Sequence, residues 1–150
     1  MTSKTFALIP ARAGSREVPR KNIQVVGRST LVERAVVSAR DSGQVDRIFV
    51  STDDAGVRGL SLGAGVTVIS RSSEASSDSA TAEMVVDEFL ASPEGPGLND
   101  DDFLVYLQPT SPFRSARHVG EALALLADGR SQSVVSVREM TQLPRYAMEI

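Results

Sequence analysis

Residues 7 to 22 read Ala7-Leu-Ile-Pro-Ala-Arg-Ala-Gly-Ser-Arg-Glu-Val-Pro-Arg-Lys-Asn22. A short apolar run therefore breaks into a loop with one glycine, two prolines and four basic side chains, which predicts a strand that delivers a cationic loop. The basic side chains can surround a polyphosphate through charge-assisted hydrogen bonds, and they are Arg12, Arg16, Arg20 and Lys21. Gly14 and Ser15 would add backbone N–H groups, as in anion-binding nests.

The loop matches neither of the common phosphate fingerprints. Both G-x-x-x-x-G-K-[ST] and G-x-G-x-x-G are absent, so phosphates would be held mainly by side chains. A charge run of this kind is also typical of a solvated surface turn. Its position directly after an apolar run favours a ligand site, because ligands in open α/β sheets bind outside the carboxyl ends of strands.

Five short apolar runs predict buried strands. They are Phe6–Ile9, Ile48–Thr52, Val66–Ile69, Phe103–Leu107 and Ser133–Val137. Helical patterns separate these runs, and this alternation is typical of a parallel sheet that is covered on both faces. The chain is therefore predicted to be an α/β protein, a three-layer α/β/α sandwich around a mostly parallel, doubly wound sheet. Residues 1–150 are expected to form a single domain.

Four helices are expected between the strands. Thr30-Leu-Val-Glu33 has the spacing of a capping box before a helix that ends near Gly43, and a weaker helix is expected from about Asp54. Ser115 can cap the last helix. The predicted inward faces carry Val57 and Leu60 in the second helix, Ala82, Val85, Val86, Phe89 and Leu90 in the third, and Val119, Ala122, Leu123 and Leu126 in the fourth.

The composition excludes several kinds of mechanism. The chain has no cysteine and one histidine, which excludes disulfides, thiolate catalysis and Cys- or His-rich metal clusters. A net charge of −3 argues against a nucleic-acid binder, whereas the local cation cluster indicates a small anionic ligand. No apolar run approaches the ~20 residues that span a bilayer, and the N-terminus lacks the plan of a signal peptide. We expect a cytoplasmic protein with no nucleic-acid or membrane partner.

Three motifs carry a resemblance to a known enzyme family. Ile9-Pro-Ala-Arg-Ala-Gly-Ser-Arg16, followed by Pro19-Arg-Lys-Asn22, resembles the first signature of the CMP-N-acylneuraminate (sialic acid) synthetases, also called acylneuraminate cytidylyltransferases. Arg71-Ser-Ser-Glu-Ala-Ser-Ser-Asp-Ser-Ala80 resembles their second motif, and Leu107-Gln-Pro-Thr-Ser-Pro-Phe-Arg114 resembles their third. The match runs in order from about Phe6 to Pro144, which makes it far more specific than one short motif.

The resemblance implies a Rossmann-like nucleotidyltransferase fold and a reaction. The anomeric hydroxyl of a nonulosonic (sialic-acid-like) sugar acid attacks the α-phosphate of CTP and releases pyrophosphate, with Mg²⁺ as cofactor. Such chemistry needs positioning and charge neutralisation more than covalent catalysis. Arg12 and Lys21 are implied as the catalytic cations. The implied nucleotide-binding set is Arg12, Ser15, Arg16, Lys21, Asn22, Arg71 and, through its backbone, Ala80. Within this set, the resemblance places Arg71 and Ala80 on the cytidine side. Gln108 and Arg114 are assigned to the acceptor sugar.

Each of these motif residues also has a structural interpretation. Asn22 is equally a turn residue, whereas Ser72–Ser79 without the resemblance favours a loop that starts the next helix, with Ser or Asp as its cap. Gln108 fits ordinary turn chemistry at the end of a strand. Arg114 fits the first turn of a helix as well as it fits a contact to an acceptor carboxylate.

Other polar groups are interpreted as structural. Asp53-Asp54 and Asp100-Asp-Asp102 suggest metal sites at first sight, but helix capping and turn formation explain both runs more simply. His118 falls in the first turn of the last predicted helix, where nothing nearby in the sequence makes it a base.

Two features depart from the resembling family. Glu17 stands where the family pattern commonly has glycine, which places an anion beside the proposed phosphate loop. The resembling enzymes also continue for about half as much again, and that part supplies dimer contacts, some of the acceptor pocket and a late aspartate pair that binds Mg²⁺. No metal ligand is assigned within residues 1–150, a homodimer is allowed for, and the chain is expected to bind CTP but to turn over slowly or not at all.

Two other functions are left open by the residues. A nucleotide-binding module that is catalytically weak, or acts in a complex or without catalysis, fits the chain length. A dinucleotide-dependent oxidoreductase fits less well, because the glycine fingerprint is missing and no acidic residue is placed for a ribose. The motifs do not choose among sialic, legionaminic, pseudaminic and related acids as the acceptor. The 3-deoxy-manno-octulosonate acceptor is less expected, since that variant of the first motif is absent.

Overall fold

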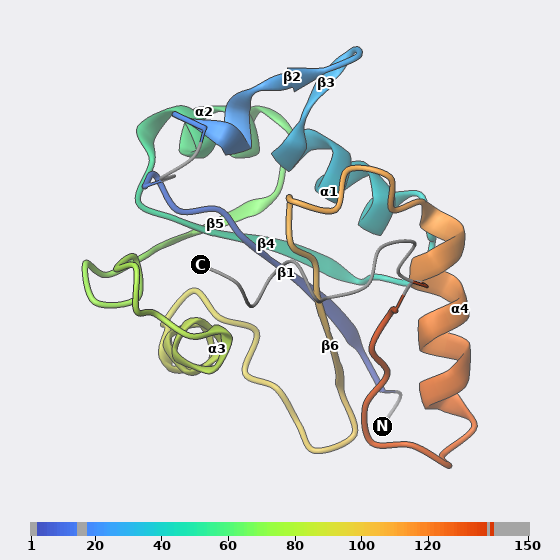
Figure 1. Ribbon diagram of the computed structural model, residues 1–150. Coiled ribbons are helices and arrows are strands. Elements are labelled where there is room, and N and C mark those ends of the chain that lie inside the picture. Colours follow the sequence, from blue (N-terminus) through green and yellow to red (C-terminus); the bar gives the residue numbers. More distant parts are fainter. Residues whose placement is uncertain (1–2, 15–17, 138, 140–150) are drawn as a thin grey trace, which may run out of the picture.

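A four-stranded parallel sheet forms the centre of the computed structural model, which describes residues 3–14, 18–137 and 139 (Figure 1). The strands lie in the order β5-β4-β1-β6. They are β1 (Thr5–Pro10), β4 (Arg47–Thr52), β5 (Thr67–Ser70) and β6 (Phe103–Tyr106). Residues 7–9 of β1 are fully buried, because strands flank β1 on both sides and helices cover both faces. The predicted α/β fold class is confirmed.

The helices give the molecule its three layers. α1 (Leu31–Arg40), α2 (Ala55–Gly63) and α4 (Ala116–Ala127) lie on one face of the sheet, and α3 (Ala82–Ala91) lies on the other (Figure 1). Successive side chains of β1 point to opposite faces of the sheet, as the pleat of a strand requires. Ala7 and Ile9 pack with α1, α2 and α4, and Phe6 and Leu8 pack with α3. Within the described residues, no helix is long and apolar enough to span a membrane.

The strand order creates a switch point between β1 and β6. From β1 the chain runs outward through β4 to β5, and then returns to place β6 on the other side of β1. Loops that follow the two strands at such a point leave in opposite directions and open a crevice at the carboxyl edge of the sheet, where ligands bind. The loops after Pro10 and after Tyr106 flank this position.

Local sequence signals set the start of α1 and α2. Thr30 and Glu33 form the predicted capping box, in which the Glu33 N–H donates to Thr30 Oγ1 (3.2 Å) and the Thr30 N–H donates to the Glu33 carboxylate (2.7 Å). Asp54 caps α2 by accepting hydrogen bonds from the N–H groups of Gly56 (2.6 Å) and Val57 (3.0 Å). The structural interpretation of Asp54 is confirmed.

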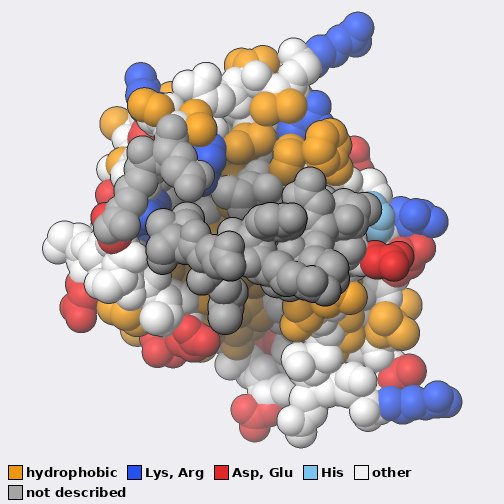
Figure 2. All heavy atoms as spheres, in the orientation of Figure 1, with side chains coloured by type: hydrophobic (Ala, Val, Ile, Leu, Met, Phe, Trp, Pro, Cys, Tyr) orange, Lys and Arg blue, Asp and Glu red, His pale blue; other side chains and the backbone are white. Residues whose placement is uncertain are grey.

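A short hairpin between β1 and α1 is a feature that the sequence patterns did not predict. β2 (Val25–Val26) pairs antiparallel with β3 (Ser29–Thr30), and Gly27 opens the two-residue turn with a φ of 74°, a conformation that glycine adopts without strain. The hairpin and the loop after β6 carry exposed apolar side chains, among them Val25 and Phe113. Figure 2 shows apolar side chains gathered on this part of the surface.

The predicted fifth strand, Ser133–Val137, is wrong. The segment makes no ladder with the described strands, and its Val135 and Val137 are 78% and 90% exposed. A run rich in β-branched residues forms a strand only where a partner satisfies its backbone and packs its side chains. β-propensity alone therefore did not decide the structure of this segment.

The prediction that Ala82 and Leu90 lie on the inner face of α3 is also wrong. Ala82 and Leu90 are exposed, whereas Val85 and Phe89 are buried against the sheet. The buried stripe of α3 is therefore narrower than the sequence spacing indicated, because the helix meets the sheet along a single line of contact.

Candidate functional site

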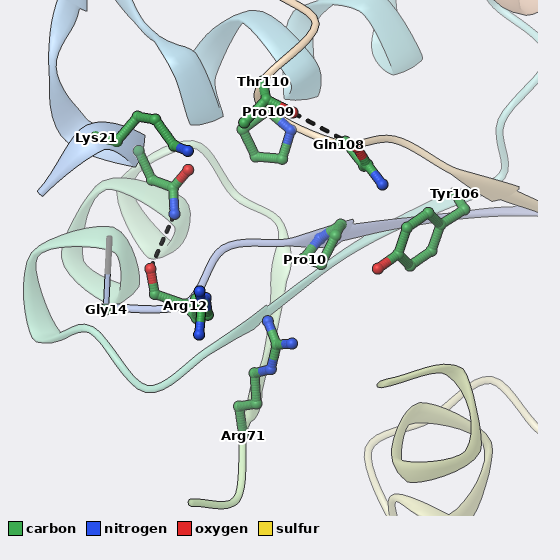
Figure 3. Close-up of a pocket in the computed structure, with 10 residues that line it drawn as sticks. Pro10, Arg12, Gly14, Lys21, Arg71, Tyr106, Gln108, Pro109 and Thr110 are labelled. Carbon is green, nitrogen blue, oxygen red and sulfur yellow. Dashed lines mark hydrogen bonds between the residues drawn. The ribbon is translucent and has the colours of Figure 1, made fainter. Parts of the chain in front are cut away.

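A cavity of about 330 Å³ opens at the carboxyl ends of β1 and β6 (Figure 3). Its volume is in the range of small-molecule sites. The lining residues come from the loop after β1, the short 3₁₀ helix η1 (Lys21–Ile23), the end of β5 and the end of β6. They are Pro10, Arg12, Gly14, Lys21, Asn22, Arg71, Tyr106, Gln108, Pro109 and Thr110. The charged side chains in this lining are cations, so the cavity favours an anionic ligand.

The cavity brings together predicted site residues from three distant motifs. Arg12, Lys21, Asn22, Arg71 and Gln108 line it. Ala80 and Arg114 lie outside that lining, and Ser15 and Arg16 lie outside the described residues, as does Glu17. Figure 3 shows Lys21, Arg12 and Arg71 reaching in from one side and Gln108 and Tyr106 from the other.

Arg12 is the most strongly tethered of the predicted phosphate contacts. Its Nη1 donates to the backbone carbonyls of Ser77 (2.9 Å) and Ser76 (3.2 Å), and it forms an ion pair with Asp78 Oδ1 (2.9 Å). These acceptors belong to the Ser-rich loop after β5, which the sequence assigns to the nucleoside. The guanidinium therefore joins the loop after β1 to the loop after β5.

The backbone around Arg12 is fixed as well. The Asn22 side-chain amide donates to the Arg12 carbonyl (2.9 Å), and the Ala13 N–H donates to Asp53 Oδ1 (2.7 Å). Thr52 Oγ1 donates to the Ala11 carbonyl (2.6 Å). Asn22 is buried and closes the loop, so its interpretation as a turn residue is correct, while its predicted contact with a nucleotide stays a prediction.

The side chains of Arg20, which directly precedes η1, and Lys21, its first residue, point in different directions. Lys21 lines the cavity, whereas Arg20 adopts a left-handed backbone conformation with a φ of 51° and sends its side chain against the start of α2. Gly56 leaves room for that side chain, since a Cβ at Gly56 would lie 2.7 Å from Arg20 Nη2. The expectation that Arg20 surrounds a ligand together with Arg12 and Lys21 is therefore wrong for the described arrangement.

Arg71 lies at the end of β5 and opens the Ser-rich loop. Its Nε donates to the Ala75 carbonyl (2.9 Å), which curls the loop back toward the sheet. Burial lowers the pKa of Arg71, and the nearby Tyr106 opposes that change. The Ala80 N–H donates to the Ser77 carbonyl (3.2 Å), so this backbone donor is already engaged within the loop.

Gln108 follows β6 and faces the cavity from the side opposite the cations. The backbone carbonyl of Gln108 accepts a hydrogen bond from Arg114 Nη2 (2.6 Å). Burial lowers the pKa of Arg114, and its Nη1 is buried without a hydrogen-bond partner among the described residues. Arg114 thus braces the backbone of Gln108 from behind, and its predicted contact with an acceptor carboxylate stays a prediction.

Tyr106 is a lining residue that the motifs did not identify. It is half-buried, burial raises the pKa of its hydroxyl, and the neighbouring Arg71 opposes that change. A signal existed in the sequence, because Tyr106 and Gln108 are two residues apart at the end of a strand, and residues at that spacing share a face.

Acidic side chains near the loop after β1 have partners within the protein. Within the described residues no group of three His, Cys, Asp or Glu side chains could hold a metal ion. The carboxylates nearest the loop after β1 are engaged, since Asp53 accepts from Ala13 and Asp78 pairs with Arg12. His118 Nδ1 accepts a hydrogen bond from the Ser115 N–H (3.1 Å) and so caps the start of α4.

Comparison with known proteins extends this picture. A family model described as Cytidylyltransferase matches residues 6–147. An N-acylneuraminate cytidylyltransferase of Streptococcus agalactiae serotype III (strain NEM316) is 34% identical over 143 residues, which cover 94% of this chain and 33% of that protein. The CMP-N,N'-diacetyllegionaminic acid synthase of Legionella pneumophila is 30% identical over 148 residues, which cover 98% of this chain and 63% of that protein. The chain thus spans about a third of the first relative and less than two thirds of the second.

Solved structures agree in fold. A CMP:2-keto-3-deoxy-manno-octonic acid synthetase complexed with CTP superposes with a TM-score of 0.67 at 23% identity, over 84% of this chain and 48% of that chain. A 4-diphosphocytidyl-2C-methyl-D-erythritol synthase gives a TM-score of 0.63 at 19% identity, over 87% of this chain and 56% of that chain. These TM-scores show that the chain shares the α/β fold of both structures.

Proposed function

Because the chain belongs to the cytidylyltransferase family, we propose that it provides the nucleotide-binding part of an enzyme that transfers CMP from CTP to a nonulosonic acid. The anomeric hydroxyl of the sugar acid would attack the α-phosphate, and pyrophosphate would leave. The relatives are named as enzymes, which does not favour the alternative of a non-enzymatic module.

One observation carries the proposal: three cations from two loops surround a cavity at the switch point, and Gln108 faces them. Arg12 and Lys21 suit the triphosphate, because a guanidinium and an ammonium both bind phosphate oxygens, the first as a fork and the second as a point charge. Arg71 lies where the nucleoside is expected, and Gln108 lies where the acceptor is expected. The α-phosphorus would then sit between the two sides.

The residues of this chain act in the proposed reaction mainly by position and charge. Phosphoryl-type transfer gains most from orientation and from stabilising the charge on the phosphate oxygens and the leaving group. Arg12 and Lys21 supply two positive charges on the side where pyrophosphate would leave. Contacts by Ser15, Arg16, Ala80 and Arg114 are part of the proposal, as is a requirement for Mg²⁺, for which the described residues supply no ligand set.

Nucleotide choice tests the first part of the proposal. We expect CTP to bind at least about tenfold more tightly than ATP, a difference of about 1.4 kcal/mol, measured by calorimetry with NADH as a third ligand. Equal affinities for CTP and ATP would contradict a cytidylyltransferase, and a preference for NADH would favour a dinucleotide-dependent enzyme.

Turnover tests the second part. Pyrophosphate release is measured with CTP and a panel of nonulosonic acids, each with Mg²⁺ and with EDTA. Release that depends on one acid identifies the acceptor, and loss of release in EDTA supports the metal requirement. Light scattering of the same sample checks the homodimer, and the cytoplasmic location stays an expectation.

A further inference from the structure

Arg12 connects two loops that the sequence assigns to different parts of the nucleotide. It extends from the loop after β1, which is the proposed phosphate loop. Its acceptors are the carbonyls of Ser76 and Ser77 and the carboxylate of Asp78, more than sixty residues further along the chain. The Arg12 side chain is 30% exposed, so these contacts are partly shielded from water.

The contacts that hold the Arg12 side chain all involve one nitrogen of its guanidinium. All three contacts are made by Nη1, and within the described ranges Nε and Nη2 make no hydrogen bond. An arginine has five N–H donors, so the opposite edge of the guanidinium is available to an anion. Arg12 can therefore hold the Ser-rich loop and contact a phosphate at the same time.

Arg12 adds a long-range contact to the second half of the Ser-rich loop. The first half is anchored separately, since Arg71 Nε donates to the Ala75 carbonyl and the Ser72 N–H donates to Glu88 (2.8 Å). Ala75 is also buried. Residues 76–78 carry the acceptors for Arg12, and the N–H groups of Ser76 and Ser77 connect them locally to the first half of the loop.

We propose that Arg12 is a clamp for the nucleoside-side loop, residues 71–80, in addition to its proposed contact with phosphate, and that Asp78 is its positioning partner. This inference rests on the proposed function. If the clamp is lost, a ligand that touches the loop must order it on binding, which weakens affinity. Arg12 should therefore contribute to the binding of cytidine, which has no phosphate.

Lys21 provides the contrast that makes the clamp testable. It lines the same cavity and carries the same charge, but its ammonium makes no hydrogen bond or ion pair in the described part of the chain. Arg58 provides a matched control, since its Nη2 donates to Ser70 Oγ (2.7 Å) at the end of β5, directly before the same loop and outside the cavity. The three cations differ in which part of the nucleotide they can affect.

The first experiment measures cytidine and CTP binding by calorimetry for the wild type and for Arg12→Ala, Lys21→Ala and Arg58→Ala. We expect Arg12→Ala to weaken cytidine binding about fivefold or more, a loss of the size that one or two hydrogen bonds produce. Lys21→Ala should weaken CTP but change cytidine by less than about twofold, and Arg58→Ala should change neither by more than that. Equal cytidine affinities for the Arg12 and Lys21 variants would overturn the clamp.

A second measurement does not depend on the ligand. Hydrogen exchange of the Ala80 amide, which donates to the Ser77 carbonyl, should accelerate in Arg12→Ala and stay near the wild-type rate in Lys21→Ala and Arg58→Ala. Unchanged exchange in Arg12→Ala would refute the clamp even if CTP binds well. Conversely, if the wild type binds CTP no better than ATP while exchange accelerates as expected, the proposed function fails and the clamp stands.

The role of Asp78 is tested through its coupling to Arg12. Asp78→Ala should weaken cytidine binding less than Arg12→Ala does, because the carbonyls of Ser76 and Ser77 still hold the guanidinium. In the Arg12→Ala background, Asp78→Ala should weaken cytidine binding little further. In the wild-type background, Asp78→Asn keeps an acceptor oxygen and should weaken cytidine binding less than Asp78→Ala does. Additive losses in the double variant would show that Asp78 does not act through Arg12.

Discussion

The two sides of the cavity are stabilised in different ways. On the nucleotide side, the loops after β1 and β5 are joined to each other by Arg12, so the groups that would meet the ligand are also the groups that hold the site together. On the sugar side, Gln108 is supported through its backbone by Arg114. Among the described residues, its side chain makes only a long 3.5 Å contact with Thr110. The nucleotide side is thus organised before a ligand arrives, which reduces the entropy lost on binding.

A single arginine of α1 links the two sides behind the cavity. Arg34 donates through Nε and Nη2 to the Val26 carbonyl (3.1 and 2.7 Å) and through Nη1 to the Pro112 carbonyl (3.3 Å). Val26 lies in the hairpin that follows Lys21, and Pro112 lies in the loop that follows Gln108. The sugar-side loop therefore takes its position from the scaffold, while its Gln108 side chain remains available for a ligand.

The largest expected effect concerns the helix that supports the nucleotide side. Phe89 of α3 is buried and packs edge-on against Phe49 of β4, with ring centroids 5.1 Å apart. We expect Phe89→Ala to lower the free energy of unfolding by about 3–5 kcal/mol, because it leaves a cavity between α3 and the sheet. Denaturant unfolding measures this change. Leu90→Ala, one position along on the exposed face, serves as the control and should stay within about 0.5 kcal/mol.

The next largest effect separates the phosphate contacts from the rest of the site. Arg12→Ala and Lys21→Ala each remove a cation that faces the proposed triphosphate. A charged hydrogen bond contributes about 1.5–3 kcal/mol, so CTP affinity should fall roughly ten- to 150-fold in calorimetry. For Lys21→Ala the loss should shrink with CMP, which offers fewer phosphates. A change below about 0.5 kcal/mol at Lys21 would mean that the cations form an ordinary solvated surface.

Gln108 is expected to behave in the opposite way. Gln108→Ala should leave CTP affinity nearly unchanged, because the side chain faces the cavity from the sugar side and is not tied to the nucleotide loops. Its effect should appear in the KM for the acceptor or in kcat/KM wherever turnover is measurable. A loss of CTP affinity as large as that of Lys21→Ala would contradict the division into two sides.

The sequence predicted the parts of the fold that depend on local patterns. Apolar runs located the four strands of the sheet to within one or two residues, and Thr30-Leu-Val-Glu33 located the start of α1. The position of the first motif directly after an apolar run also predicted a ligand site at the carboxyl edge of the sheet, and the cavity lies at that edge. Such features follow from periodicity and from the general rule for ligand sites in α/β sheets.

Features that depend on distant contacts were not predictable in this way. Arg20 and Lys21 are neighbours in the sequence, and only the left-handed backbone of Arg20 and the space above Gly56 send them apart. The pairing of Arg12 with Asp78 joins residues that no local pattern relates. Ser133–Val137 has strand propensity but no strand partner among the described residues.

The smallest expected effect concerns the cap that starts α1, behind the nucleotide side. Hydrogen bonds from the N–H and the hydroxyl of Thr30 to the carboxylate lower the pKa of Glu33 below its ordinary value of 4.5. A lowered pKa in the folded state means that the ionised form stabilises the fold above pH 4.5 and that this contribution is lost as the pH falls through the folded pKa. Glu33→Gln should therefore lower stability at pH 7 by about 0.5 kcal/mol, a modest value because solvent screens this partly exposed carboxylate. The difference from the wild type should shrink below pH 4.5 in denaturant unfolding followed across pH. Glu121→Gln, an exposed change within α4, controls for the loss of one negative charge. A Glu33→Gln deficit that stays constant from pH 7 to pH 3 would show that the cap stabilises α1 without its charge.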